Sequence, residues 1–131
     1  MSKEFKYTTR IYYEDTDAGG VVYYANYLKF LERARSEAIY SLGLSNRELL
    51  EKEGIIIIVK SCNIEYKKPA KFEDEIQIIS TIKEVKNSSF KMQQLIHKET
   101  TVISEAVVLL VTVNKEGKPV RIPNLLKKLI D

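Results

Sequence analysis

The sequence has few of the residues on which disulfide-rich and metal-binding proteins depend. Its 131 residues include one cysteine, Cys62, one histidine, His97, and no tryptophan. One cysteine excludes an intramolecular disulfide framework and a multi-cysteine zinc or iron–sulfur site, and one histidine excludes a histidine-rich metal centre. Segment 1–10 is charged and lacks the apolar core of a secretory signal. The sequence therefore predicts a cytoplasmic protein.

Long apolar runs and linkers are also missing. The longest purely apolar run, 106–111, is far shorter than the roughly 20 residues of a membrane-spanning helix, so we expect no transmembrane segment. Only 5 glycines and 3 prolines are present, which excludes linker-like and collagen-like chains. With 44% hydrophobic residues and no internal repeat, the sequence predicts a single domain over residues 1–131.

The charge is nearly balanced. The 21 basic and 18 acidic residues leave a net charge of +3. Basic residues do not alternate with aromatic ones along one face, so nucleic acid is not an expected partner. The balance does permit a small polyanionic ligand.

Hydrophobic periodicity in the first half predicts one strand and one long helix. A strand is expected over 5–13, followed by a loop over 14–20. The helix should begin between positions 22 and 26 and end near Gly43. Ser45 and Glu48 have capping-box spacing and predict a second, short helix to residue 52. The expected apolar face of the long helix consists of Leu28, Leu31, Ala34, Ala38 and Leu42.

The second half predicts strands over 55–66, 75–85, 90–96 and 100–113, and a short terminal helix over 123–130. The fold class is α+β, with one long helix on a five-stranded, mostly antiparallel sheet. In the first of these strands, alternation places Ile58, Cys62, Ile64 and Tyr66 on one side, with Cys62 buried. The last strand is apolar on both faces, which predicts that a second subunit covers its outer face.

The segment from Tyr12 to Arg35, YYEDTDAGGVVYYANYLKFLERAR, holds the groups that suggest chemistry. Two aspartates precede a glycine pair, and a helix begins among three tyrosines. A helix N-terminus offers unpaired N–H groups that suit an anion or a developing oxyanion. A carboxylate beside it could act as a base or a nucleophile.

This segment resembles the signature of the hotdog-fold acyl-CoA thioesterases, in the branch of 4-hydroxybenzoyl-CoA thioesterase and its YbgC-type relatives. The fingerprint matches nearly every position from Tyr13 to Arg35, and the strand order agrees over almost the whole chain. The resemblance implies a hotdog fold, in which the sheet wraps the long helix. It also implies homodimers or homotetramers with active sites at the dimer interface.

The resemblance also implies roles for particular residues. Asp17 occupies the position of the catalytic aspartate, which attacks the thioester carbonyl or activates water. The backbone N–H of Tyr24 would polarise the thioester oxygen. Many YbgC-type relatives have histidine at this position, but the backbone role survives the substitution. The acyl-CoA substrate carries its own coenzyme A, so no separate cofactor is expected. The expected substrate contacts near the helix start are Gly19, Gly20, Tyr23, Asn26 and Tyr27.

The nucleotide end of coenzyme A would contact the turn that contains Lys86, Ser88 and Ser89, with Arg121 as a further contact. For the other polar residues the structural interpretation is the simpler one. Asp15 should shape the loop, the tyrosine rings at the helix start could pack or bind substrate, and His97 is expected on the surface.

Two alternatives remain open. A hydratase or dehydratase of the same fold would need a histidine with a carboxylate partner, and His97 lies far from the motif in the sequence. A non-catalytic acyl-CoA-binding module would bind the ligand without turnover, because a fold alone does not prove an activity.

Overall fold

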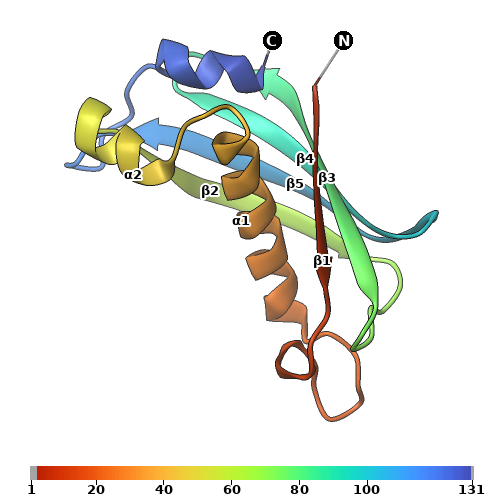
Figure 1. The fold of residues 1–131 in the computed structure, drawn as a ribbon. Coiled ribbons are helices and arrows are strands. Elements are labelled where there is room, and N and C mark those ends of the chain that lie inside the picture. The colour runs from red at the N-terminus through yellow and green to blue at the C-terminus, as the bar shows by residue number, and fades with distance from the viewer. Residues whose placement is uncertain (1–2, 131) are drawn as a thin grey trace.

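A computed structural model describes residues 3–130, which form a five-stranded sheet with one long helix across it (Figure 1). Neighbouring strands follow the order β1-β3-β4-β5-β2, and every neighbouring pair is antiparallel. The predicted α+β hotdog architecture is therefore confirmed. The strands are β1 (Glu4–Arg10), β2 (Ile56–Tyr66), β3 (Glu75–Val85), β4 (Ser89–Lys98) and β5 (Thr101–Val113).

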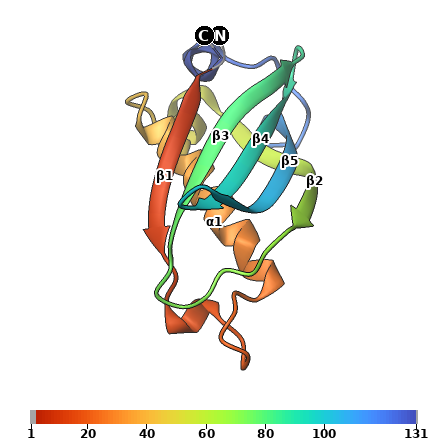
Figure 2. The same ribbon diagram turned by 90° about the vertical axis from the view of Figure 1, so that its right-hand side faces the viewer.

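Helix α1 (Tyr24–Tyr40) lies across one face of the sheet (Figures 1 and 2). Its apolar face is rotated relative to the prediction. Leu28, expected in the core, is 47% exposed, while Leu42 beyond the helix is only partly buried against the core. The large rings of Tyr27 and Phe30 are buried instead, so the face of the helix that meets the sheet is shifted from the predicted one. The buried helix residues are Tyr27, Phe30, Leu31, Ala34, Ala38 and Ile39.

The chain leaves the sheet earlier than predicted before it enters α1. Strand β1 ends at Arg10, and Tyr13–Asp15 form a 3-10 turn, η1. The Asp15 carboxylate accepts a hydrogen bond from the Tyr12 backbone N–H over 2.9 Å, which stabilises this turn. The predicted loop-shaping role of Asp15 agrees with this contact. The loop that follows is thereby placed directly below the start of α1 (Figure 1).

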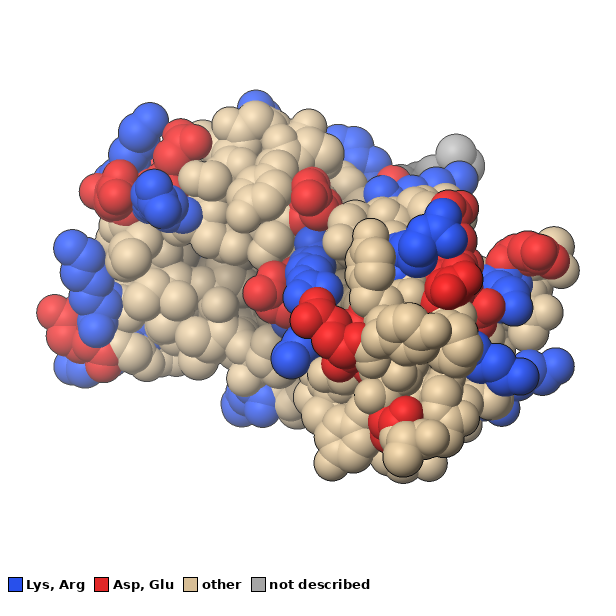
Figure 3. All heavy atoms as spheres, turned by 60° about the horizontal axis from the view of Figure 1, so that its bottom comes forward, with Lys and Arg blue, Asp and Glu red and all other residues tan. Residues whose placement is uncertain are grey.

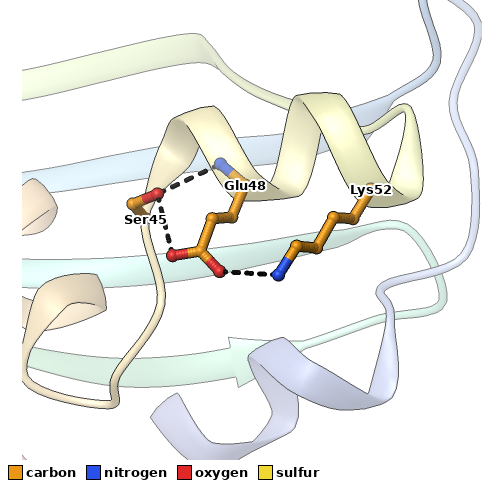
Figure 4. Close-up of polar contacts among 3 residues, drawn as sticks. All are labelled: Ser45, Glu48 and Lys52. Atoms are coloured by element: carbon orange, nitrogen blue, oxygen red, sulfur yellow. Dashed lines mark hydrogen bonds and ion pairs between the residues drawn. The ribbon is translucent and has the colours of Figure 1, made fainter.

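The predicted short helix follows α1 as α2 (Asn46–Glu48) and continues as the π-helical segment η2 (Leu49–Glu53). Gly43 ends the preceding turn with a φ of 80°, a conformation that favours glycine. Ser45 Oγ accepts from the Glu48 N–H over 3.0 Å, and the Glu48 carboxylate also meets Lys52 Nζ at 3.3 Å (Figure 4). These contacts hold α2 and η2 beside the beginning of β2.

A β-bulge corrects the predicted alternation of β2. The register shifts between Val59 and Ser61, so residues before the bulge change sides relative to those after it. Ile58 pairs with Val111, whereas Cys62 pairs with Val108 in the core. Ile58 and Cys62 therefore do not share a side. Cys62 is also exposed rather than buried, because β2 is an edge strand with no neighbouring strand on its far side.

The C-terminal part agrees with the prediction in outline. The terminal helix is the 3-10 helix η3 (Asn124–Leu129). On the outer face of β5, Val107 is 41% exposed in the single chain, so cover by a second subunit remains a prediction. His97 is half-buried rather than exposed, and its Nε2 has no hydrogen-bond partner within residues 3–130. No helix in that range is long and apolar enough to cross a membrane.

Candidate active site

The Asp17 carboxylate lies on the exposed loop between η1 and α1. Its Oδ1 accepts a hydrogen bond from the Gly19 backbone N–H over 2.8 Å. The Gly20 N–H donates to the Asp17 backbone carbonyl, and the Asp17 N–H donates to Val21. The loop is therefore a tight turn that holds the carboxylate by backbone contacts alone. Viewed from this end of the molecule, scattered charges of both signs surround uncharged areas (Figure 3).

Glycine is favoured at the two glycine positions of the motif for different structural reasons. A Cβ at Gly19 would lie 3.2 Å from Asp17 Oδ1, closer than most Cβ contacts. Gly20 has a φ of 78°, and a Cβ there would touch the ring of Phe72 at 3.4 Å. Both positions therefore favour glycine, one because of the carboxylate and the other because of its backbone conformation.

The start of α1 leaves a backbone donor free. The N-cap residue, Tyr23, makes no side-chain capping hydrogen bond. Within the described part of the chain, the Tyr24 N–H has no intramolecular acceptor. Asn26 instead fastens the loop to the helix, because its side-chain amide donates to the Asp15 carbonyl over 2.8 Å. The structure thus gives Asn26 a positioning contact and leaves the Tyr24 N–H available for a ligand.

Asp17 and the helix start line a common cavity of about 410 Å³. Its far wall is Tyr66, at the end of β2, whose ring lies 4.9 Å from Tyr24 and 5.2 Å from Tyr27. The Tyr66 hydroxyl donates to the Tyr24 carbonyl over 3.3 Å. Lys67 and Lys68 complete the rim. The cavity is therefore an aromatic slot with one carboxylate and one free helix N–H.

The three tyrosines predicted at the helix start have different environments. Tyr27 is buried, and its hydroxyl accepts from the Ala70 N–H over 3.2 Å, so its ring is a packing element. Tyr23 and Tyr24 are more than half exposed. Burial raises the pKa of Tyr27, and burial followed by the nearby Cys62 and Tyr24 raises that of Tyr66. Both hydroxyls are therefore neutral near pH 7 and can only donate or accept hydrogen bonds.

The predicted contacts for coenzyme A gather at a second place. Lys86, Ser88 and Ser89, at the turn between β3 and β4, line a pocket of about 350 Å³. Arg121 lies next to this turn, with its Nε 3.2 Å from Asn87 Oδ1. The pocket also contains Lys60 and Lys91, which sequence reasoning did not select. They could not be found from spacing because they come from β2 and β4 and meet only when the sheet forms.

These two groups of predicted residues lie at opposite ends of the sheet. Ser89 pairs with Val111 in β5, and Val111 pairs in turn with Ile58 in β2. The Asp17 cavity, in contrast, includes Tyr66 at the other end of β2. Eight positions separate Ile58 from Tyr66, which is roughly 26 Å along a strand. The structure therefore brings Asp17, Gly20, Tyr23, Tyr24 and Tyr27 together in one chain and keeps the basic turn apart.

The site that sequence reasoning missed is the aromatic wall. The sequence predicts Tyr66 only as part of a strand and does not single out Lys67 or Lys68. Their one sequence signal is their position where β2 ends, next to the turn that contains Pro69. One of these lysines is partly neutralised, since Lys67 Nζ lies 3.3 Å from Glu105 Oε2.

A carboxylate beside an unsatisfied helix N-terminus can promote attack on a carbonyl whose oxygen the N–H polarises. Together with the hotdog fold, this arrangement is typical of a thioester hydrolase. The chain belongs to the thioesterase-like superfamily, whose family model matches residues 12–130. The family predicted from the sequence is thus confirmed.

Individual relatives agree with this assignment. The chain is 39% identical to the acyl-CoA thioesterase YbgC of Haemophilus influenzae over 97% of this chain and 94% of that protein. A probable thioesterase from Bartonella henselae superposes with a TM-score of 0.89, at 34% identity, over 92% of this chain and all of the other. A 4-hydroxybenzoyl-CoA thioesterase, at 23% identity, shares the fold with a TM-score of 0.90 over 98% and 99% of the two chains.

Proposed function

We propose that this protein hydrolyses an acyl-CoA thioester to a free carboxylic acid and coenzyme A, with Asp17 in the chemistry. The observation that carries the proposal is the cavity that Asp17 and the uncapped start of α1 line together. The 39% identical relative is named an acyl-CoA thioesterase, which supports the same substrate type. The reaction needs water and the substrate alone.

Two routes use the same carboxylate. As a general base, Asp17 takes a proton from water while the water oxygen bonds to the thioester carbon. The C–S bond then breaks, and the coenzyme A thiolate takes the proton back from Asp17. As a nucleophile, Asp17 bonds to the carbon and expels the thiolate, and water then cleaves the resulting anhydride. Both routes end with the acid, coenzyme A and a regenerated carboxylate.

The Tyr24 N–H supports either route. Negative charge develops on the thioester oxygen as the carbon becomes tetrahedral, and a fixed backbone donor stabilises that charge more than the ground state. One such donor typically lowers the barrier by about 3 kcal/mol. Because the donor is backbone, the tyrosine side chain is not required for this role.

A two-fold dimer would unite the two groups of binding residues. The β2 edge exposes Ile56, Ile58 and Val59, whereas the opposite edge strand, β1, exposes charged residues. An apolar edge suits antiparallel pairing with a second copy. If the two β2 strands paired antiparallel about Cys62, Ile58 of one protomer would lie opposite Tyr66 of the partner subunit. The basic turn of one protomer would then serve the Asp17 cavity of the other.

Thiol release from acetyl-, butyryl-, hexanoyl-, palmitoyl- and benzoyl-CoA tests the proposal. Wild-type protein should turn over at least one of these, and Asp17→Asn should reduce kcat by at least about 100-fold, the usual contribution of a positioned acid–base group. Glu14→Gln is the matched control, because Glu14 is an exposed acid of the adjoining turn η1. Its kcat should match the wild type.

Two results would count against the proposal. Full activity in Asp17→Asn would remove Asp17 from the mechanism. Stabilisation of the fold by acyl-CoA without any thiol release would indicate a binding module instead of an enzyme.

A further inference from the structure

The turn that carries Asp17 has internal contacts that fix its shape but not its place in the molecule. The Gly19 and Gly20 N–H groups both donate to Asp17, and the Asp17 N–H donates to the Val21 carbonyl. Most of the turn is exposed. A solvent-exposed turn that contains two glycines has a flexible backbone. Its position relative to the start of α1 therefore depends on contacts from elsewhere in the chain.

Phe72 is the residue that meets this turn from outside. The segment between β2 and β3 passes beside the loop, where Lys71 bridges to Val21 (Figures 1 and 2). Among the described residues, the only hydrogen bond to the Asp17–Gly20 turn from outside segment 15–23 comes from the Phe72 N–H to the Gly20 carbonyl. At 3.4 Å it is longer than the roughly 2.9–3.0 Å of a typical backbone bond, and so it is weak.

The Phe72 ring provides the closer contact. A Cβ at Gly20 would meet two atoms of this ring at 3.4 and 3.6 Å, so the ring lies against the glycine. The ring also stacks on Tyr13 of η1, with centroids 4.8 Å apart and an interplanar angle of 28°. Stacked aromatic pairs attract one another beyond the effect of buried area. One ring therefore contacts the chain both before and after Asp17.

The turn that presents Phe72 is itself anchored. The Asp74 N–H donates to the Lys71 carbonyl over 3.1 Å, and Glu73 within this turn has a φ of 69°. That left-handed conformation is uncommon in residues other than glycine and persists where surrounding contacts impose it. The Glu73 N–H donates to the Ile11 carbonyl over 2.7 Å, and the Ile11 N–H donates to the Asp74 carbonyl over 2.9 Å. Because Ile11 is fully buried, the ring projects from a fixed backbone onto a flexible loop.

We infer that Phe72 is a positioning residue for Asp17, whose carboxylate its ring holds in place beside the start of α1. The inference rests on the proposed function, in which Asp17 must meet the carbon whose oxygen the Tyr24 N–H polarises. Phe72 is not among the described residues that line the Asp17 cavity, so it acts through the loop and not on the substrate. It is 39% exposed and lies outside the hydrophobic core, so its removal should spare the fold.

Steady-state thiol release by Phe72 variants tests the inference. Phe72→Ala should lower kcat at least about ten-fold and keep KM within about two-fold, because a reacting group is misplaced while substrate contacts remain. Phe72→Tyr keeps the ring and should retain kcat within about two-fold. Tyr40→Ala is the matched control, since Tyr40 is an exposed aromatic residue at the other end of α1. Its kcat should match the wild type.

Tyr13→Ala tests the same contact from the opposite side, and it does so even if Phe72→Ala fails to fold. Loss of the stacking partner should lower kcat about three-fold, within the range of one aromatic pair. Adding Tyr13→Ala to Phe72→Ala should cause no further loss, because both changes remove one contact. Independent, multiplying losses would contradict a role through the stacked pair.

Nitrogen-15 relaxation gives a readout that needs no turnover. In Phe72→Ala the order parameters of the Gly19 and Gly20 N–H groups should fall from about 0.85, typical of rigid backbone, to below about 0.6. The N–H of Ile96, in the middle of the sheet, should keep its wild-type value, because β4 pairs on both sides. Loosening of β4 as well would indicate a general structural role and would overturn the inference.

The two readouts separate this inference from the proposed reaction. Full kcat in Phe72→Ala, with Asp17→Asn inactive, would overturn the inference and leave the reaction standing. Unchanged order parameters at Gly19 and Gly20 would overturn it too, because the ring would not be what holds the loop. A mobile loop in Phe72→Ala combined with full activity in Asp17→Asn would confirm that Phe72 holds the loop and would remove Asp17 from the reaction.

Discussion

Asp17 Oδ1 and the Gly19 backbone N–H are joined by a hydrogen bond of 2.8 Å, and a Cβ at Gly19 would lie 3.2 Å from the same oxygen. The position of the proposed catalytic carboxylate therefore depends on residue 19 having no side chain. A turn aspartate normally makes such a contact for structural reasons. Here the contact leaves the other carboxylate oxygen, Oδ2, without a hydrogen-bond donor from the described part of the chain.

Gly19→Ala should lower activity more than stability. The added methyl group would displace Asp17 by a few tenths of an ångström or more, and small misplacements of a reacting group can cost up to about 100-fold in rate. We expect kcat to fall at least about ten-fold, with an unfolding free energy within about 1 kcal/mol of wild type. Gly117→Ala should show the reverse, a lower unfolding free energy with unchanged kcat. Gly117 has a φ of 81°, which disfavours alanine, and it lies in a turn far from Asp17. Unchanged kcat in Gly19→Ala would show that Asp17 tolerates the shift.

Tyr66 should matter through its ring more than its hydroxyl. The ring forms the wall of the slot against Tyr24 and Tyr27, whereas the hydroxyl makes one 3.3 Å contact to a carbonyl. We expect Tyr66→Phe to keep kcat/KM within about three-fold and Tyr66→Ala to lower it at least about ten-fold, since an aromatic contact and its buried area are worth over 1 kcal/mol. Steady-state kinetics of both variants would decide this. Equal losses would assign the role to the hydroxyl.

Asp74 gives the turn beside the site a dependence on pH. Its carboxylate accepts from the Lys71 N–H over 2.9 Å and meets Lys98 Nζ at 3.0 Å. Burial alone would raise the pKa of Asp74, but these contacts outweigh it and hold that pKa below its usual value. A depressed carboxyl pKa adds stability that is present above the unfolded value and lost as the pH falls through the folded value.

Asp74→Asn should therefore lower the unfolding free energy near pH 6 by about 1–2 kcal/mol, the usual cost of losing charge-assisted contacts. The difference from wild type should shrink below about pH 4, where aspartate in the unfolded chain is protonated. Urea unfolding at a series of pH values measures this. A difference that stays constant down to pH 2 would mean that the carboxylate charge is not responsible.

The sequence predicted most of the fold because local patterns and final burial agree. Strand 75–85 was predicted at its observed bounds, and the Ser45–Glu48 spacing located α2. The exceptions arise where tertiary structure intervenes. The bulge after Val59 reverses the faces of β2, and nothing in its alternation marks the extra residue. Leu28 has helical spacing with the core, but the larger rings of Tyr27 and Phe30 take the buried stripe.

The candidate site likewise has one part that the sequence could predict and one part that it could not. The loop and helix start are contiguous in sequence, so Asp17, Gly19 and Tyr24 could be selected together. Tyr66 and Lys60 are distant in sequence and reach their pockets only through strand pairing, so spacing could not indicate them. The residues predicted for the basic turn, Lys86, Ser88 and Ser89, line one pocket, but the distance of that pocket from Asp17 within one chain follows only from the register of the sheet.

The distance between Asp17 and the basic turn within one chain leads to a prediction about mixed dimers. Lys86→Glu combined with Lys91→Glu should impair the basic pocket, and Asp17→Asn should impair the reaction. If each site takes Asp17 from one protomer and the turn from the other, a mixed dimer contains one intact site and one doubly impaired site. Random mixing of equal amounts makes half of the dimers mixed, so activity should recover to about a quarter of wild type.

The control for this experiment is each variant alone after the same denaturation and refolding, which should stay inactive. Thiol release at subsaturating acyl-CoA is the measurement, because weaker coenzyme A binding appears in KM. Absence of recovery, with mixed dimers verified by two affinity tags, would place both groups of residues in one chain. The substrate would then have to span the sheet from Ser89 to Tyr66, roughly 26 Å along a strand, and the pairing of β2 edges would not be needed for catalysis.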